Sequence, residues 1–151
     1  MMKIRRVLHP TDFSPASRRA FDCSIEVARR DKAELLIVHA LAVVVPMIGE
    51  GYVSPAAFDE VQRAARAQGQ TQLDAAVARA RKAGTRARGL LLEGVAATQI
   101  ARAAKSQRAD VIVMGTHGRT GLARVFLGSV AERVVGTAPC PVLTVRGRAG
   151  R

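Results

Sequence analysis

The sequence predicts an α/β fold: an open, doubly wound, Rossmann-like sheet of five parallel strands with helices on both faces. Five short apolar runs alternate along the 151 residues with longer amphipathic stretches. Strands that alternate with helices pair in parallel through right-handed crossovers. The fourth run, residues 110–114, reads DVIVM and is almost wholly apolar, as expected for a strand buried on both faces.

The first apolar run covers residues 3–9 and predicts the first strand. Ser14 and Pro15 follow it, and they are typical of the cap and the first residue of a helix. Apolar residues then recur at helical spacing as far as about Arg30. The second strand is predicted over residues 34–41, which read ELLIVHAL.

A loop over residues 42–55, rich in Val, Gly and Pro, leads into a long predicted helix that ends near Gly84. One face of that helix is predicted to be buried. It carries Phe58, Val61, Ala65, Leu73, Val77 and Ala80.

The second half of the chain continues the alternation. Predicted strands cover residues 85–92, 110–114 and 141–146, and predicted helices cover residues 95–107 and 129–135. The length suits one domain, residues 1–151, with a sizeable core.

Composition indicates a soluble globular protein, with 48% hydrophobic and 24% charged residues. The amino terminus lacks the apolar segment of a signal peptide, and the longest apolar run, residues 35–48, is too short to span a bilayer. We therefore expect a cytoplasmic protein without a membrane partner. Cys23 and Cys140 show no metal-binding spacing and are expected to be reduced thiols.

The formal net charge of +12 raises the question of a nucleic-acid partner. Aromatic residues make up only 3% of the chain, so platforms for stacking single-stranded bases are nearly absent. The arginines are also scattered along the sequence, which favours solvated helix faces. A nucleic acid is therefore not the expected partner.

Residues 115–129, GTHGRTGLARVFLGS, follow the fourth strand and are rich in glycine. Gly115 and Gly118 would let backbone amides approach a ligand without side chains in the way. Gly128 and Ser129 stand where the next helix begins, and a helix N-terminus favours phosphate. The segment fits a Walker loop poorly because no lysine follows its last glycine, and its spacing differs from the dinucleotide fingerprint.

Two interpretations that require no ligand remain open for this segment. Ser129 and Glu132 match the S-x-x-E capping box, and Gly115 and Gly118 could simply turn a tight corner.

Doubly wound sheets bind ligands past the carboxyl ends of their strands, where the strand order reverses. The residues at those ends are Pro10, Thr11, Asp12, Ala40 and Glu93, together with the glycine-rich segment. Asp12 offers a carboxylate that could accept hydrogen bonds from ribose hydroxyls. Alternatively, Asp12 helps to cap the first helix, although Ser14 is better placed for that.

The chain resembles a single-domain universal stress protein. The resemblance rests on PTDFSPAS, LIVHA, VIVMGTHGRTG, LGSVAERVV and PCPVLTVR, which occur in the family's order over nearly the whole chain. The family's ATP-binding branch carries the motif G-x2-G-x9-G-[ST]. Its positions here are Gly115, Gly118, Gly128 and Ser129, with the spacing intact.

The resemblance implies the strand order 3-2-1-4-5 and assigns roles to the candidate site. Asp12 would contact ribose, and backbone near Ala40 and Met114 would contact adenine. Gly115, Gly118, Gly128, Ser129 and Val130 would line the phosphates. Pro10, Thr11, His117 and Arg119 complete the expected site, with Arg119 favoured over Arg124 as a phosphate neighbour.

The expected ligand is ATP or another adenine nucleotide, with or without a Mg²⁺ or Mn²⁺ ion on its phosphates. His9, His39 and His117 could instead converge on a metal, but packing at strand ends is the simpler interpretation. No general base for hydrolysis stands out among the acidic residues at the strand ends. A nucleotide-dependent stress-response regulator is therefore expected, with a slow ATPase and a nucleotide-free module that binds a protein or a nucleic acid as alternatives.

The last predicted strand, from Pro141 to Arg146, lies at the edge of the implied sheet. An apolar edge strand invites pairing with another chain unless the C-terminal tail covers it. The family commonly dimerises through this strand, so the resemblance implies a homodimer.

Overall fold

The structure, a computed structural model, describes residues 2–43, 54–117 and 127–147. Ten elements follow one another along these residues. They are β1 (Arg6–Pro10), the 3₁₀ turn η1 (Pro15–Ser17), α1 (Arg18–Asp31), β2 (Glu34–Leu41), α2 (Pro55–Lys82), β3 (Arg86–Glu93), α3 (Ala96–Ser106), β4 (Val111–Gly115), α4 (Ser129–Thr137) and β5 (Val142–Val145).

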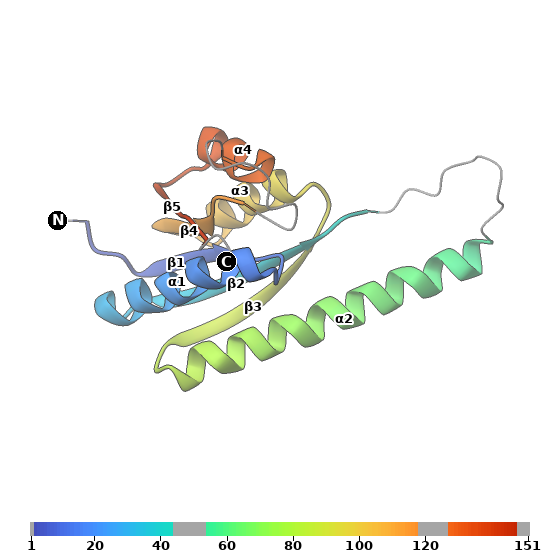
Figure 1. The fold of residues 1–151 in the computed structure, drawn as a ribbon, viewed down its shortest axis with the longest axis horizontal. Coiled ribbons are helices and arrows are strands. Elements are labelled where there is room, and N and C mark those ends of the chain that lie inside the picture. Colours follow the sequence, from blue (N-terminus) through green and yellow to red (C-terminus); the bar gives the residue numbers. More distant parts are fainter. Residues whose placement is uncertain (1, 44–53, 118–126, 148–151) are drawn as a thin grey trace.

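The five strands form one parallel sheet in the order β3-β2-β1-β4-β5, which confirms the predicted fold class (Figure 1). β2 has the predicted bounds, and it pairs along its whole length with β3. β1 pairs with β2 over five residues but with β4 over only two, Val7 with Val111 and Leu8 with Ile112. The sheet therefore opens between β1 and β4, where the strand order reverses.

Helices cover both faces of the sheet. Consecutive strand residues point to opposite faces, so Val7 packs beneath α1 and α2 while Leu8 packs beneath α3 and α4. The first core contains Phe21 and Leu73, and the second contains Ile100. Each face of the sheet thus has its own hydrophobic core.

The prediction of a buried face is wrong for the amino-terminal half of α2. Buried residues of α2 begin at Gly69, whereas Phe58 is half-buried and Val61 and Ala65 are exposed. Twenty-eight helical residues span about 42 Å. The eight residues of β3 span only about 26 Å, so the helix outruns the sheet, as Figure 1 shows.

The start of the first helix also differs from the prediction. Ser14 precedes a 3₁₀ turn, and its side chain makes no capping hydrogen bond to that turn. Instead, the Ser14 backbone N–H donates to Oδ1 of Asp12 at 2.9 Å. Asp12 therefore does shape the entry to this helix, in a tight turn formed by its own side chain.

Candidate functional site

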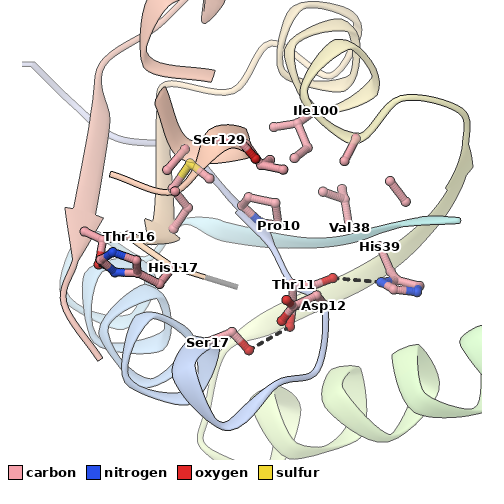
Figure 2. Close-up of a pocket in the computed structure, with 17 residues that line it drawn as sticks. Pro10, Thr11, Asp12, Ser17, Val38, His39, Ile100, Thr116, His117 and Ser129 are labelled. Atoms are coloured by element: carbon pink, nitrogen blue, oxygen red, sulfur yellow. Dashed lines mark hydrogen bonds between the residues drawn. The ribbon is translucent and has the colours of Figure 1, made fainter. Parts of the chain in front are cut away.

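A pocket of about 330 Å³ lies at the carboxyl ends of β1, β2 and β4. Ten of the twelve candidate residues line it: Pro10, Thr11, Asp12, Ala40, Met114, Gly115, His117, Gly128, Ser129 and Val130. The other two, Gly118 and Arg119, lie outside the described residues, as does Arg124. Residues far apart in sequence thus meet where the sheet opens (Figure 2).

Seven further lining residues were not named as site residues from the sequence, although Thr116 belongs to the glycine-rich segment. They are Ser17, Val38, His39, Ala96, Ile100, Thr116 and Ala131. Strand alternation carries a signal for Val38, because it shares a strand face with Ala40. Ile100 lies within the helix predicted over residues 95–107, and nothing in its spacing shows that it reaches a pocket.

The loop after β1 is held by hydrogen bonds at both of its ends. The Thr11 N–H donates to the Val38 carbonyl at 2.9 Å, and Nδ1 of His39 donates to the Thr11 carbonyl at 2.8 Å. The Thr11 hydroxyl lies 3.3 Å from that of Ser17 (Figure 2). These contacts fix the position of Asp12 at the edge of the pocket.

Phe13 has an unusual backbone conformation within this loop. Its φ of 60° is left-handed, a region that costs a non-glycine residue free energy. The Phe13 N–H donates to Oγ1 of Thr11 at 3.0 Å, and the Phe13 ring lies 4.5 Å from the ring of His39, centroid to centroid. The surrounding contacts therefore hold a conformation that the residue would not favour alone.

His9 lies at the opening between β1 and β4. Its Nδ1 donates to the Val113 carbonyl at 2.8 Å, and its ring packs 5.5 Å from that of Phe21. The side chain is fully buried, and burial lowers the pKa of His9 to about 4. His9 is thus a neutral residue of the core at neutral pH.

The amino terminus of α4 faces the pocket from the other side. Gly128 is the N-cap, with φ −60° and ψ 158°, and Ser129 is the first helical residue. The first hydrogen bond within the helix runs from the Glu132 N–H to the Gly128 carbonyl at 2.9 Å. The N–H groups of Ser129, Val130 and Ala131 therefore have no acceptor within the helix, and all three residues line the pocket.

The capping box considered for this helix is not formed. Such a box needs its serine at the N-cap, but the extended cap conformation belongs to Gly128, and no side chain caps the helix. Gly128 also has little room, since a Cβ there would lie 3.0 Å from the Thr116 carbonyl oxygen. Gly115 has neither a positive φ nor a close backbone contact that would require glycine.

Comparison with known proteins gives the family. The Universal stress protein family matches residues 3–146. The chain belongs to that family. A universal stress protein of Methanocaldococcus jannaschii is 36% identical over 142 residues, which cover 94% of this chain and 82% of the relative.

Solved structures of the family share the fold of this universal stress protein. UspA from Lactobacillus plantarum superposes with a TM-score of 0.80 at 24% identity, over 97% of this chain and all of that one. A universal stress protein in complex with cAMP has a TM-score of 0.67 at 25% identity, over 97% of this chain and 99% of that one.

The three histidines of this universal stress protein do not converge. Nδ1 of His9 and of His39 bond to separate backbone carbonyls, and Nδ1 of His117 lies 2.9 Å from the Thr116 hydroxyl. Within residues 2–43, 54–117 and 127–147, no three His, Cys, Asp or Glu side chains are grouped to hold a metal ion. Strand-end packing accounts for His9, and His39 holds the loop after β1.

The acidic residues at the strand ends divide between two places. Asp12 lines the pocket, whereas Glu93 is outside the lining and pairs with Arg66 at 2.5 Å. Asp12 is therefore the one carboxylate among the described lining residues.

In the part of the chain that the structure describes, no helix is long and apolar enough to cross a membrane.

Proposed function

We propose that this universal stress protein binds an adenine nucleotide, expected to be ATP, in the pocket at the opening of the sheet. The observation that carries the proposal is the combination of chemistry in the lining of that pocket. Apolar side chains of Val38, Ile100 and Met114 line the same pocket as the Asp12 carboxylate and the α4 amino terminus. A nucleotide likewise combines a flat base, a sugar with hydroxyls and an anionic phosphate chain.

Each candidate residue has a role in this proposal. Backbone near Ala40 and Met114 contacts adenine, and Asp12 accepts hydrogen bonds from the ribose, with Pro10 and Thr11 beside it. The N–H groups that begin α4 suit phosphate, because they lack acceptors within the helix and carry its partial positive charge. The phosphate neighbours are Gly115, His117, Gly128, Ser129 and Val130, together with Gly118 and Arg119 beyond the described residues.

The presence of glycine at position 115 is a second observation that supports the proposal. The backbone conformation and the surrounding space at this position would allow a residue with a side chain, so the turn itself does not require a glycine. Room for a ligand against the β4 end does explain it. The related structure in complex with cAMP adds support, because it has the same fold at 25% identity and holds an adenine nucleotide.

Holding the nucleotide, with or without hydrolysis, fits a regulator of the stress response. A Mg²⁺ or Mn²⁺ ion would be held mainly by the phosphates, since Asp12 is the one lining carboxylate that is described. Such ions need few protein ligands when phosphates supply the rest. We include in the proposal a cytoplasmic location, which suits the free thiols Cys23 and Cys140.

The proposal also includes a homodimer formed through β5. This strand is at the edge of the sheet and pairs on one side with β4, in a register that places Leu143 opposite Val113. Leu143 is 43% exposed, which is high for a leucine in a sheet. Pairing two copies of β5 would cover this edge.

Mass spectrometry of ligand released from freshly purified protein tests the proposal, together with calorimetric titration of ATP, ADP, AMP and cAMP. We expect a bound adenine nucleotide and an affinity that the double variant Asp12→Ala/Gly128→Ala loses. The proposal would be contradicted if no adenine nucleotide were released and no calorimetric binding were seen at millimolar concentration. Turnover measured with the same double variant separates true hydrolysis from a contaminating ATPase.

A further inference from the structure

The fold gathers basic residues that are scattered in the sequence at the end of the sheet opposite the pocket. Parallel strands begin there and the helices α1, α2 and α3 end there. We call the segments 3–6, 29–34, 81–88 and 105–110 the basic end. They contain twelve basic and three acidic residues, a formal charge of +9 out of the chain's +12. The remaining residues carry twelve basic and nine acidic side chains.

Hydrogen bonds show that these four segments form one surface. The Glu34 N–H donates to the Arg5 carbonyl at 2.8 Å, and the Arg86 guanidinium donates to the Lys32 carbonyl at 3.2 Å. On the other side, the Asp110 carboxylate accepts the Arg5 N–H at 2.7 Å. The basic end is therefore continuous from β3 to β4.

The acidic residues of the basic end are already engaged. Glu34 pairs with Arg6 at 3.5 Å and with Arg88 at 2.8 Å. Asp31 pairs with Arg30 at 3.1 Å, and Asp110 accepts backbone N–H groups of both Arg5 and Arg6. The acids thus neutralise or position neighbours within the surface, and they leave its outer charge positive.

A row of exposed cations crosses this surface, one at the start of each of four adjacent strands. In sheet order the row is Arg86, Lys32, Arg5 and Arg108. Neighbouring strands lie about 4.8 Å apart, so the row spans about 15 Å. Favourable interaction with helix carboxyl ends explains basic residues in the last helical turns, such as Arg29, Lys82 and Lys105. It also accounts for Arg86, whose guanidinium bonds to the carbonyl of Lys32, the C-cap of α1, but it does not explain Arg5, which precedes β1.

We propose that the basic end binds a nucleic-acid duplex through its backbone phosphates. The four segments contain no aromatic residue and no large apolar side chain except Ile4. They therefore offer no platform for stacked bases, no apolar anchor of the kind that dominates protein interfaces, and no wedge for a membrane. Guanidinium and ammonium groups suit phosphate oxygens, and duplex phosphates recur at short, regular spacing. The expected binding is independent of sequence.

Fluorescence anisotropy with a labelled 25-base-pair DNA duplex of mixed sequence tests this. For four to six phosphate contacts, raising the salt from 50 to 200 mM should weaken binding about 10²- to 10³-fold. The variant Arg5→Gln/Arg86→Gln/Arg108→Gln should bind at least about tenfold more weakly at 50 mM salt, with a shallower salt dependence. The variant Lys32→Gln/Lys82→Gln/Lys105→Gln removes the same charge from other positions of the basic end and should behave alike.

The matched control is Arg18→Gln/Arg19→Gln/Arg63→Gln, which removes three exposed arginines near the pocket end. Its affinity for the duplex should be within about twofold of that of the unsubstituted protein, since the three arginines that it removes lie outside the basic end and make few contacts with phosphate. Absence of duplex binding at 50 mM salt would overturn the proposal. An equal loss in the control would also overturn it, as would binding of polyglutamate or anionic vesicles in place of the duplex.

Binding at the basic end is independent of the pocket. Both basic-end variants should bind adenine nucleotide like the unsubstituted protein, because no residue that they change lines the pocket. A failure to bind the duplex would therefore not contradict the proposed nucleotide site, and a failure to bind nucleotide would not contradict binding of a duplex at the basic end.

Discussion

Nδ1 of His9 lies 2.8 Å from the carbonyl oxygen of Val113, one residue beyond the last backbone pair of β1 and β4. The imidazole thus takes over from the backbone ladder where the two strands part. Nδ1 donates to the carbonyl, so Nε2 is unprotonated, and it is buried without a hydrogen-bond partner in the described structure. The two strands are thus connected, where their backbone pairing stops, by a side chain that must stay neutral.

The pH dependence of stability should report His9. Burial lowers its pKa from 6.5 to about 4, so the unfolded chain takes up a proton before the folded protein does. This contribution to stability is complete above pH 6.5 and is lost as the pH falls toward 4. Between pH 7.5 and 5 the loss should be about 2 kcal/mol.

Urea unfolding at several pH values measures that slope. His9→Asn keeps a donor close to the Val113 carbonyl but cannot titrate, so its stability should change less over the same range. Equal slopes in the two proteins would show that His9 does not titrate with a lowered pKa.

The left-handed Phe13 predicts an unusual order of stability among its variants. Phe13→Ala loses the contact with the His39 ring and keeps the cost of a left-handed alanine. Phe13→Gly loses the same contact but has no such cost. The glycine variant should therefore be more stable than the alanine variant by about 1 kcal/mol in urea unfolding. The opposite order would mean that position 13 is not left-handed in solution.

Periodicity and topology predict much of this fold from the sequence. Alternating apolar runs gave β2 its correct bounds, and the family resemblance implied the observed strand order. Ligands bind past the carboxyl ends of the strands where the strand order reverses, and this rule predicts a site at Asp12 and at the segment after β4. The structure brings the described members of both groups to one pocket.

The remaining features depend on distances that a linear pattern does not contain. The exposure of Val61 follows from the length of α2 relative to the sheet, although its spacing fits the buried face. Ser129 matches a capping motif, but the cap conformation falls one residue earlier, on Gly128. The basic end arises because parallel topology brings four separate segments together, and their charges look scattered along the chain.

Asp12→Asn should weaken binding of ATP about 10- to 100-fold, because an amide is a poorer acceptor for ribose hydroxyls than a carboxylate. The substitution keeps an oxygen for the Ser14 N–H, so the turn after β1 should survive. Calorimetry with ATP and with 2′,3′-dideoxy-ATP measures the effect, and the dideoxy analogue should bind both proteins equally. Asp22→Asn, on the exposed face of α1, is the control. An equal loss of affinity for both ligands would contradict a ribose contact.

Gly128→Ala and Gly136→Ala form a matched pair within α4. A Cβ at Gly128 would lie 3.0 Å from the Thr116 carbonyl oxygen, whereas one at Gly136 would meet nothing within 4 Å. Gly128→Ala should shift the start of the helix and reduce nucleotide affinity at least about tenfold. Gly136→Ala should leave affinity unchanged and stabilise the fold by about 0.5–1 kcal/mol. Calorimetry and urea unfolding distinguish the two, and unchanged affinity in Gly128→Ala would place the phosphates elsewhere.

Leu143→Glu should convert the proposed dimer to a monomer. In a two-fold pairing of β5 strands, residue 143 of one copy lies near the same residue of its partner, so two carboxylates would face each other at the edge of the sheet. The sedimentation equilibrium of the variant should show a dimer dissociation constant raised at least about tenfold. Val61→Glu makes a similar change at a 60% exposed position on α2 and should leave assembly unaltered. A dimer that persists in Leu143→Glu would assign the interface to another surface, and dissociation in Val61→Glu would implicate the exposed half of α2.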